Sequence, residues 1–111
     1  MPEAIPLEDI PGSDRARRFE GKGHGATVSF FITSHERGQG PDLHRHPYEE
    51  TFIVQAGEGT FTADGKETEV TAGHVLVVPA NTPHKFVSSG DGPLRMVTIH
   101  PAPEMEQEDL E

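Results

Sequence analysis

The chain contains no cysteine among its 111 residues. This absence excludes disulfides, thiolate zinc sites and cysteine nucleophiles together. Long apolar runs are missing as well, because the longest aliphatic run, Val75 to Val78, has four residues. A helix that crosses a bilayer needs roughly 20. We therefore expect no membrane-spanning segment and no membrane partner.

Positive charge is scarce: nine Lys and Arg stand against nineteen Asp and Glu, and the net charge is −10. This sign is opposite to that of a nucleic-acid-binding surface, so nucleic acid is not an expected partner. Residues 1–12 carry acids and three prolines in place of a basic start and an apolar stretch. They do not resemble a secretory signal, and a cytoplasmic location is expected. We interpret Arg15, Arg17 and Arg18 as surface charge and not as an anion site.

The length predicts one domain. The 12 glycines and 10 prolines make the chain rich in turns without reaching a composition typical of disorder. No segment of 10 to 15 residues has helical periodicity, so antiparallel strands are favoured over βαβ units. Short runs rich in β-branched and aromatic residues predict about eight strands and an all-β barrel or sandwich. These runs are 26–34, 42–46, 50–55, 59–63, 66–70, 74–78, 84–88 and 94–100.

Three segments are expected along the chain: an extended N-terminal arm at 1–25, the barrel at 26–100 and a solvated acidic tail at 101–111. Asp64-Gly65 predicts a type I′ hairpin between two of the strands. The run Val75 to Val78 is apolar at consecutive positions, which indicates that both faces of its strand are covered. Either the N-terminal arm or a second subunit could cover the outer face, and we favour a homodimer.

The histidine pattern carries most of the chemical information. His44 and His46 are two residues apart, so in an extended strand their imidazoles project from the same face and can share a metal ion. Pro47 interrupts that strand, and a chain reversal would bring the Glu50 carboxylate beside them. His84 follows a stretch made rigid by two prolines and begins another strand.

These residues stand in a recognisable pattern, which resembles that of the cupin family over about residues 38–88. The first cupin motif is matched in full by Gly38, His44, His46, Glu50 and Gly57. The second is matched at Gly73, Pro79 and His84, but Asn81 replaces a glycine and Ser88 replaces an asparagine. Asn81 is a mild change, since asparagine tolerates left-handed backbone better than most residues.

The resemblance implies a jelly roll, also called a double-stranded β-helix. It also implies one divalent transition metal ion per chain, held by His44, His46, Glu50 and His84. The mixed nitrogen and oxygen ligands suit Fe, Mn, Ni, Cu or Zn without choosing among them. An octahedral ion would keep two positions for water, dioxygen or a small-molecule substrate.

Four further side chains are candidates for a pocket wall. Phe52 and Val54 share the parity of Glu50, and Phe86 shares that of His84, so all three should face the interior, where core packing is favoured over contact with a substrate. Tyr48 could reach the pocket mouth. The remaining histidines are expected at the surface or at capping positions; they are His24, His35, His74 and His100.

Two functions remain open on this evidence. The first is a metal-dependent enzyme on a small molecule, with an oxygenase first and an isomerase, cyclase or decarboxylase as variants. The second is a binding module without catalysis, acting as a sensor, carrier or accessory subunit. A barrel whose ion is only structural is a third interpretation. The lack of a second interior carboxylate as general base counts modestly against complex proton transfer.

Overall fold

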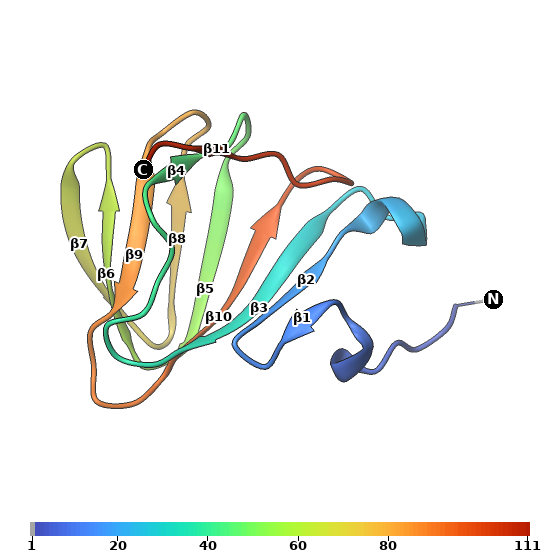
Figure 1. Ribbon diagram of the computed structural model, residues 1–111, viewed down its shortest axis with the longest axis horizontal. Helices are drawn as coiled ribbons and strands as arrows, with labels where there is room; N and C mark the ends of the chain where they lie inside the picture. The colour runs from blue at the N-terminus through green and yellow to red at the C-terminus, as the bar shows by residue number, and fades with distance from the viewer. Residues whose placement is uncertain (1) are drawn as a thin grey trace.

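Two antiparallel sheets face each other in the computed structural model, which describes residues 2–111 (Figure 1). The six-stranded sheet runs in the order β1 (Gly12–Ser13), β2 (Ala16–Phe19), β3 (Ser29–His35), β10 (Leu94–His100), β5 (Glu50–Ala56) and β8 (His74–Val78). The five-stranded sheet runs in the order β11 (Glu108–Asp109), β4 (His44–Arg45), β9 (His84–Ser88), β6 (Glu58–Ala63) and β7 (Lys66–Thr71). The helical turns are the 3₁₀ segments η1 (Leu7–Asp9) and η2 (Gly21–His24). The expected all-β class is confirmed, and each of the eight predicted runs overlaps a strand.

Alternation along the strands separates the interior from the surface. In β10 the side chains at 94, 96, 98 and 100 are buried while Arg95 is exposed. The inward set changes along the strand from apolar to polar, since Leu94 and Met96 precede Thr98 and His100. The apolar part belongs to one core cluster, formed by Phe52, Val54, Phe61, Val70, Val78, Phe86, Leu94 and Met96. The polar part faces the site described below.

The β6–β7 hairpin turns at Asp64 and Gly65, as the sequence predicts. Both residues have positive φ, 50° and 76°, and Ala63 pairs with Lys66 on either side of them. A type I′ turn requires positive φ at both centres, which Asp tolerates and Gly adopts freely.

Both chain ends take part in the sheets, although the sequence predicts them outside the barrel. β2 pairs with β3, with Phe19 opposite Phe30, and extends the six-stranded sheet. β11 in the acidic tail pairs with β4, with Asp109 opposite His44. Surface ion pairs join the tail to the barrel, including Arg45 with Glu108 at 2.9 Å. The tail therefore lies against the strand that carries the first histidine of the motif.

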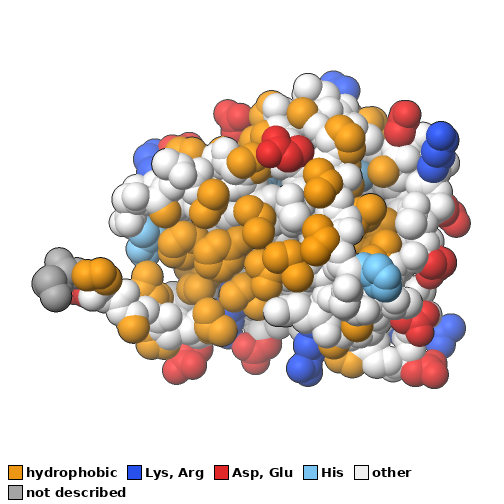
Figure 2. Space-filling model, turned by 180° about the vertical axis from the view of Figure 1, so that it is seen from behind, with side chains coloured by type: hydrophobic (Ala, Val, Ile, Leu, Met, Phe, Trp, Pro, Cys, Tyr) orange, Lys and Arg blue, Asp and Glu red, His pale blue; other side chains and the backbone are white. Residues whose placement is uncertain are grey.

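The outer face of β8 is left uncovered by the part of the chain that the structure describes. Val75 and Val77 are 62% and 53% exposed. The N-terminal strands lie at the opposite edge of the same sheet, so they do not shield β8. Figure 2 shows hydrophobic side chains gathered in a broad patch on the back of the molecule. Within residues 2–111, no helix combines the length and apolarity needed to cross a membrane.

Candidate metal centre

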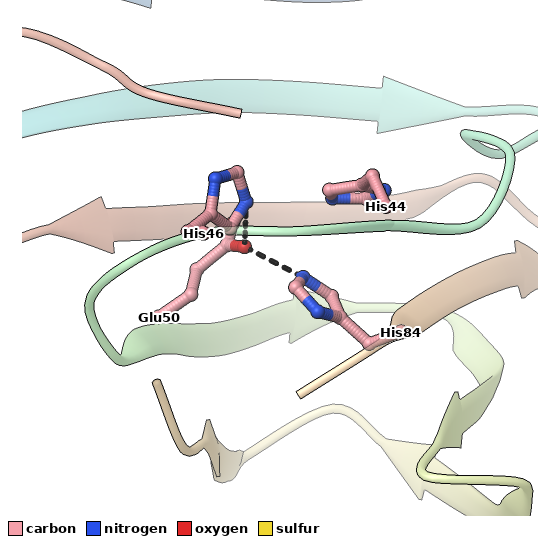
Figure 3. A group of neighbouring side chains, drawn as sticks. All are labelled: His44, His46, Glu50 and His84. Carbon is pink, nitrogen blue, oxygen red and sulfur yellow. Dashed lines mark hydrogen bonds and ion pairs between the residues drawn. The ribbon is translucent and has the colours of Figure 1, made fainter. Parts of the chain in front are cut away.

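Four side chains from three strand regions converge in the interior (Figure 3). His44 lies in β4, His46 follows it on the same face, Glu50 begins β5 and His84 begins β9. His44 and His84 are opposite each other in the β4–β9 register. One ligand atom from each of the four residues lies within 4.8 Å of the others, and all four residues are buried. Strand pairing thus brings together the four residues that the sequence motifs predict.

Backbone carbonyls fix the orientation of all three imidazoles. His44 Nδ1 donates to Asp42 O at 2.7 Å and His84 Nδ1 to Thr82 O at 2.8 Å. His46 Nδ1 donates to Glu106 O at 2.7 Å. A neutral imidazole that donates through Nδ1 keeps a lone pair on Nε2, which is the form that binds metals. These contacts therefore prepare the three imidazoles as metal ligands.

The spacing of the carboxylate also suits an ion. Glu50 Oε1 lies 3.0 Å from both His46 Nε2 and His84 Nε2. Two ligands about 2.1 Å from an ion and at right angles to each other would be about 3.0 Å apart. The donor set is therefore compatible with one divalent transition metal.

Electrostatics favour a charged carboxylate at this position. Burial alone would raise the pKa of Glu50, but the imidazoles of His100, His46 and His84 outweigh it and hold this pKa well below its usual range. Burial is the main cause that lowers the pKa of His44. Burial also acts to lower the pKa of His46, but the bonds to Glu50 and to the Glu106 carbonyl outweigh it and raise this pKa.

A fourth histidine belongs to this cluster, and the sequence prediction that places it at the surface or at a capping position is wrong. His100 is 1% exposed, and its Nε2 lies 3.2 Å from Glu50 Oε2. The Tyr48 hydroxyl donates to His100 Nδ1 at 2.6 Å and accepts a bond from the Glu106 N–H at 3.1 Å. Burial raises the pKa of Tyr48, so this hydroxyl keeps its proton. The inward parity of Leu94, Met96 and Thr98 along the same strand was the signal that could have identified His100.

A cavity of about 330 Å³ borders the cluster. Its lining includes His44, His46, Glu50 and His100, so three of the four clustered residues border open space. The other lining residues are Arg15, Ala16, Phe31, Thr33, His35, Gly40, Pro41, Phe86, Thr98 and Gln107.

Of the four side chains considered as pocket wall, Phe86 lines this cavity. Phe52 and Val54 are each 1% exposed and pack in the apolar core instead. Tyr48 lies behind the cluster, with its ring stacked on His46 at 5.3 Å between centroids. His35 is 8% exposed and lines the cavity, which corrects the expectation of a surface residue.

The two departures from the second motif leave the site intact. Asn81 has φ of 61°, the left-handed conformation that glycine adopts freely, and its N–H donates to His46 O at 2.7 Å. Ser88 is buried and its backbone joins β9 to the loop before β4, since Gly38 N donates to Ser88 O at 2.8 Å.

Comparison with known proteins identifies the family. Residues 31–100 match the model of the cupin domain, so the chain belongs to the cupin family. An uncharacterised protein of Methanocaldococcus jannaschii is 36% identical over 56 residues, which are 50% of this chain and 45% of that protein.

Solved structures share the fold. A Klebsiella pneumoniae protein with a double-stranded β-helix domain, also uncharacterised, superposes with a TM-score of 0.75 at 18% identity, over 97% of this chain and 96% of its own. Oxalate decarboxylase from Lactobacillus farciminis gives 0.78 at 22% identity, over 89% of this chain and 32% of its own. Bacillus subtilis oxalate decarboxylase, which has Mn(II) centres, gives a TM-score of 0.79 at 24% identity, over 94% of this chain and 30% of its own. The chain thus spans under half of the archaeal relative and about a third of the decarboxylases, and the predicted jelly roll is confirmed.

Proposed function

We propose that this protein is a metal-dependent enzyme that acts on a small molecule, with one divalent ion per chain held by His44, His46, Glu50 and His84. One observation carries the proposal: three oriented imidazoles and a charged carboxylate converge in one buried cluster, and three of these four residues, His44, His46 and Glu50, line a cavity of about 330 Å³. A purely structural site would be expected to have its ligands enclosed by packing, whereas catalytic sites keep open positions.

The donor set suits Fe(II), Mn(II), Ni(II), Cu(II) or Zn(II). The Mn(II) centres of Bacillus subtilis oxalate decarboxylase, which has the same fold, add weight to testing manganese beside iron. A bound ion of this kind polarises a substrate oxygen or activates dioxygen, and an oxygenase is the reaction class we place first.

The chain's own residues have distinct parts in this proposal. His100 Nε2 lies beside Oε2 of Glu50 at 3.2 Å, whereas Oε1 lies beside His46 and His84. Phe31 and Phe86 supply apolar surface in the cavity lining, which restricts water around the bound substrate.

A binding module without catalysis is the second candidate. Among the described residues that line the cavity, Glu50 is the one carboxylate, and it is assigned to the ion. A reaction that needs a carboxylate as separate general base therefore lacks one here, which favours simple binding or a reaction driven by the metal alone.

A turnover assay distinguishes the metal-dependent enzyme from the binding module. The protein would be loaded anaerobically with Fe(II) or with Mn(II), then mixed with oxygen and candidate phenolic or diketone substrates while oxygen and products are followed. We expect oxygen consumption that His84→Ala abolishes and that the exposed-residue control His24→Ala retains. Stoichiometric metal without turnover in any mixture would favour the binding module, and turnover that survives in His84→Ala would contradict the assigned site.

A further inference from the structure

The cavity has a second group of polar side chains, which are separate from the four residues proposed to bind the metal. We call this group the polar wall. Thr33 Oγ1, Thr98 Oγ1 and His35 Nδ1 are buried and have no hydrogen-bond partner among residues 2–111. The three residues are only 7%, 3% and 8% exposed, and all line the cavity. Buried polar side chains are normally bonded, and leaving one without a partner costs stability. Three such groups in one cavity point to a ligand that supplies the missing partners.

Strand register makes these side chains neighbours on one surface. Thr33 and His35 are two residues apart in β3, so both face inward. Thr33 pairs with Met96 in β10, which makes Thr98 its diagonal neighbour on the same face. Thr98 is in turn two residues from His100, which contacts Glu50. The polar surface therefore runs from β3 to the edge of the metal centre.

A cationic side chain lies on the same cavity. Arg15 is exposed, contributes to the lining and precedes β2. Its backbone carbonyl is fixed by Ser34 N at 2.9 Å, beside the polar wall. Its neighbours Arg17 and Arg18 have carboxylate partners, Asp14 at 2.6 Å and Glu20 at 3.6 Å, and no ion pair of Arg15 occurs among residues 2–111. Arg15 thus supplies positive charge to the cavity of a chain whose net charge is −10.

His35 offers hydrogen bonds and not charge. Burial is the main cause that lowers the pKa of His35 below its ordinary value of 6.5, and the charge of Arg15 acts in the same direction. The ring stacks edge-on against Phe86 at 5.3 Å, so its position is held by packing. A neutral imidazole and two hydroxyls can both donate and accept, which suits hydroxyl and carbonyl oxygens.

From this arrangement we infer that the ligand of the cavity is a small organic acid with a further hydroxyl or carbonyl oxygen, its carboxylate paired with Arg15 and its other oxygen bound by Thr33, Thr98 and His35. A volume of 330 Å³ is at the small end of ligand pockets, in keeping with a compact molecule. The inference deepens the proposed function by naming a substrate class, and the polar wall does not itself depend on the metal.

Binding of matched probes tests the inference. Lactate, malonate and salicylate would be titrated against the protein as purified and after chelator treatment, each beside its neutral amide, with calorimetry or ligand-observed NMR. The variants are Thr33→Val, Thr98→Val and Arg15→Gln. Thr51→Val and Arg95→Gln are controls on the outward face of the same sheet. Thermal midpoints and metal content of every variant are measured in parallel.

We expect at least one acid to bind about tenfold or more tightly than its amide, since an arginine–carboxylate bond is charge-assisted. Arg15→Gln removes that preference, and each threonine variant weakens binding about tenfold. Both threonine variants keep their metal content and unfold at the same or a higher temperature, because an unpartnered hydroxyl is replaced by a methyl group of similar shape. The controls bind as the wild type does.

The inference is overturned if no acid binds, if amides bind equally well, or if Arg15→Gln retains the preference. Loss of stability in both threonine variants would also contradict it, since that would assign the hydroxyls a structural role. Acid binding that depends on Arg15, in a protein that neither contains a divalent metal as purified nor takes one up when loaded, would sink the proposed enzyme and keep this inference. Stoichiometric metal without acid binding would overturn this inference and leave the proposed metal site in place.

Discussion

At the scale of single residues, three backbone carbonyls determine which imidazole nitrogens are free to bind a metal. Each accepts the Nδ1 proton of one imidazole, so His44, His46 and His84 present Nε2 toward Glu50. Two of these acceptors are local, since Asp42 and Thr82 precede their histidines by two residues. The third, Glu106, is 60 residues from His46 and belongs to the tail. The two local motifs predict the four clustered residues, whereas the contact between His46 and Glu106 depends on how the tail packs.

Tyr48 and His100 are positioning residues for Glu50 in this account. Tyr48→Phe keeps the ring on His46 but removes the hydroxyl bonded to His100, and His100→Gln removes the imidazole beside Oε2. We expect each to weaken metal binding by about 10-fold to 100-fold, as for other groups that orient metal ligands. Competition with a chromophoric chelator measures this affinity, with exposed His74→Gln as control. Equal affinity in all four proteins would remove the positioning role.

The metal-free protein should show a window of pH in which Glu50 stabilises it most. The lowered pKa of Glu50 gives stability that is fully present above its ordinary value of 4.5 and is lost as pH falls through the lowered pKa. The raised pKa of His46 gives stability that is fully present below 6.5 and is lost as pH rises through the raised pKa. The lowered pKa of His44 changes stability with pH in the opposite direction to the raised pKa of His46. Burial is the main cause of the His44 shift, so this shift is nearly the same in wild type and Glu50→Gln and largely cancels in the comparison.

Thermal midpoints of chelator-treated wild type and Glu50→Gln, compared between pH 3 and 9, measure this effect. We expect the advantage of the wild type to be largest between pH 4.5 and 6.5 and to shrink on both sides. An advantage that rises steadily with pH would show that His46 does not contribute.

At the scale of elements, strands with clear alternation were predictable, whereas the strands near the two chain ends were not. The alternating β5 and β10 each have seven residues and were found from their pattern. β1 and β11 have two residues each, and β2 carries Arg17 and Arg18 among its four, so none shows a period of two. Their pairing is decided by the neighbouring strand and not by their own composition.

The tail is an element with a role at the site. Removal of residues 103–111 takes away the Glu106 carbonyl bonded to His46 and the Glu106 N–H bonded to Tyr48. We expect metal affinity to fall about tenfold or more. A chain shortened only by residues 108–111 keeps Glu106 and loses β11, and it should retain most of that affinity. Chelator competition on both truncated chains checks this, and equal affinities would assign the tail no part in orienting His46.

At the scale of the whole molecule, the sequence predicted the family and the four clustered residues because they lie in two local motifs. The polar wall and His100 were not predicted, because they face the cavity only through the pairing of β3, β10 and β5. Subunit assembly is the remaining feature at this scale. Apolar side chains lie next to one another on the outward face of the six-stranded sheet, because Ile53 in β5 pairs with both Val97 in β10 and Val75 in β8.

This face predicts a homodimer, because a contiguous apolar surface is buried in most stable assemblies. Val77→Lys, at a position 53% exposed, should fold normally and shift the protein toward monomer. Sedimentation velocity measures the change, with Glu67→Lys on exposed β7 as control for the added charge. A wild-type protein that stays monomeric at high micromolar concentration would contradict the prediction.

Elemental analysis is the most direct measurement of whether the buried cluster binds a divalent metal. Wild type, His46→Ala and His74→Ala would be purified without tag or chelator, with folding checked by circular dichroism. His46 is 2% exposed at the centre of the cluster, whereas His74 is exposed on β8. We expect about one transition metal ion per chain in wild type and His74→Ala, and little or none in His46→Ala. Metal absent from the wild type, or retained in full by folded His46→Ala, would contradict it.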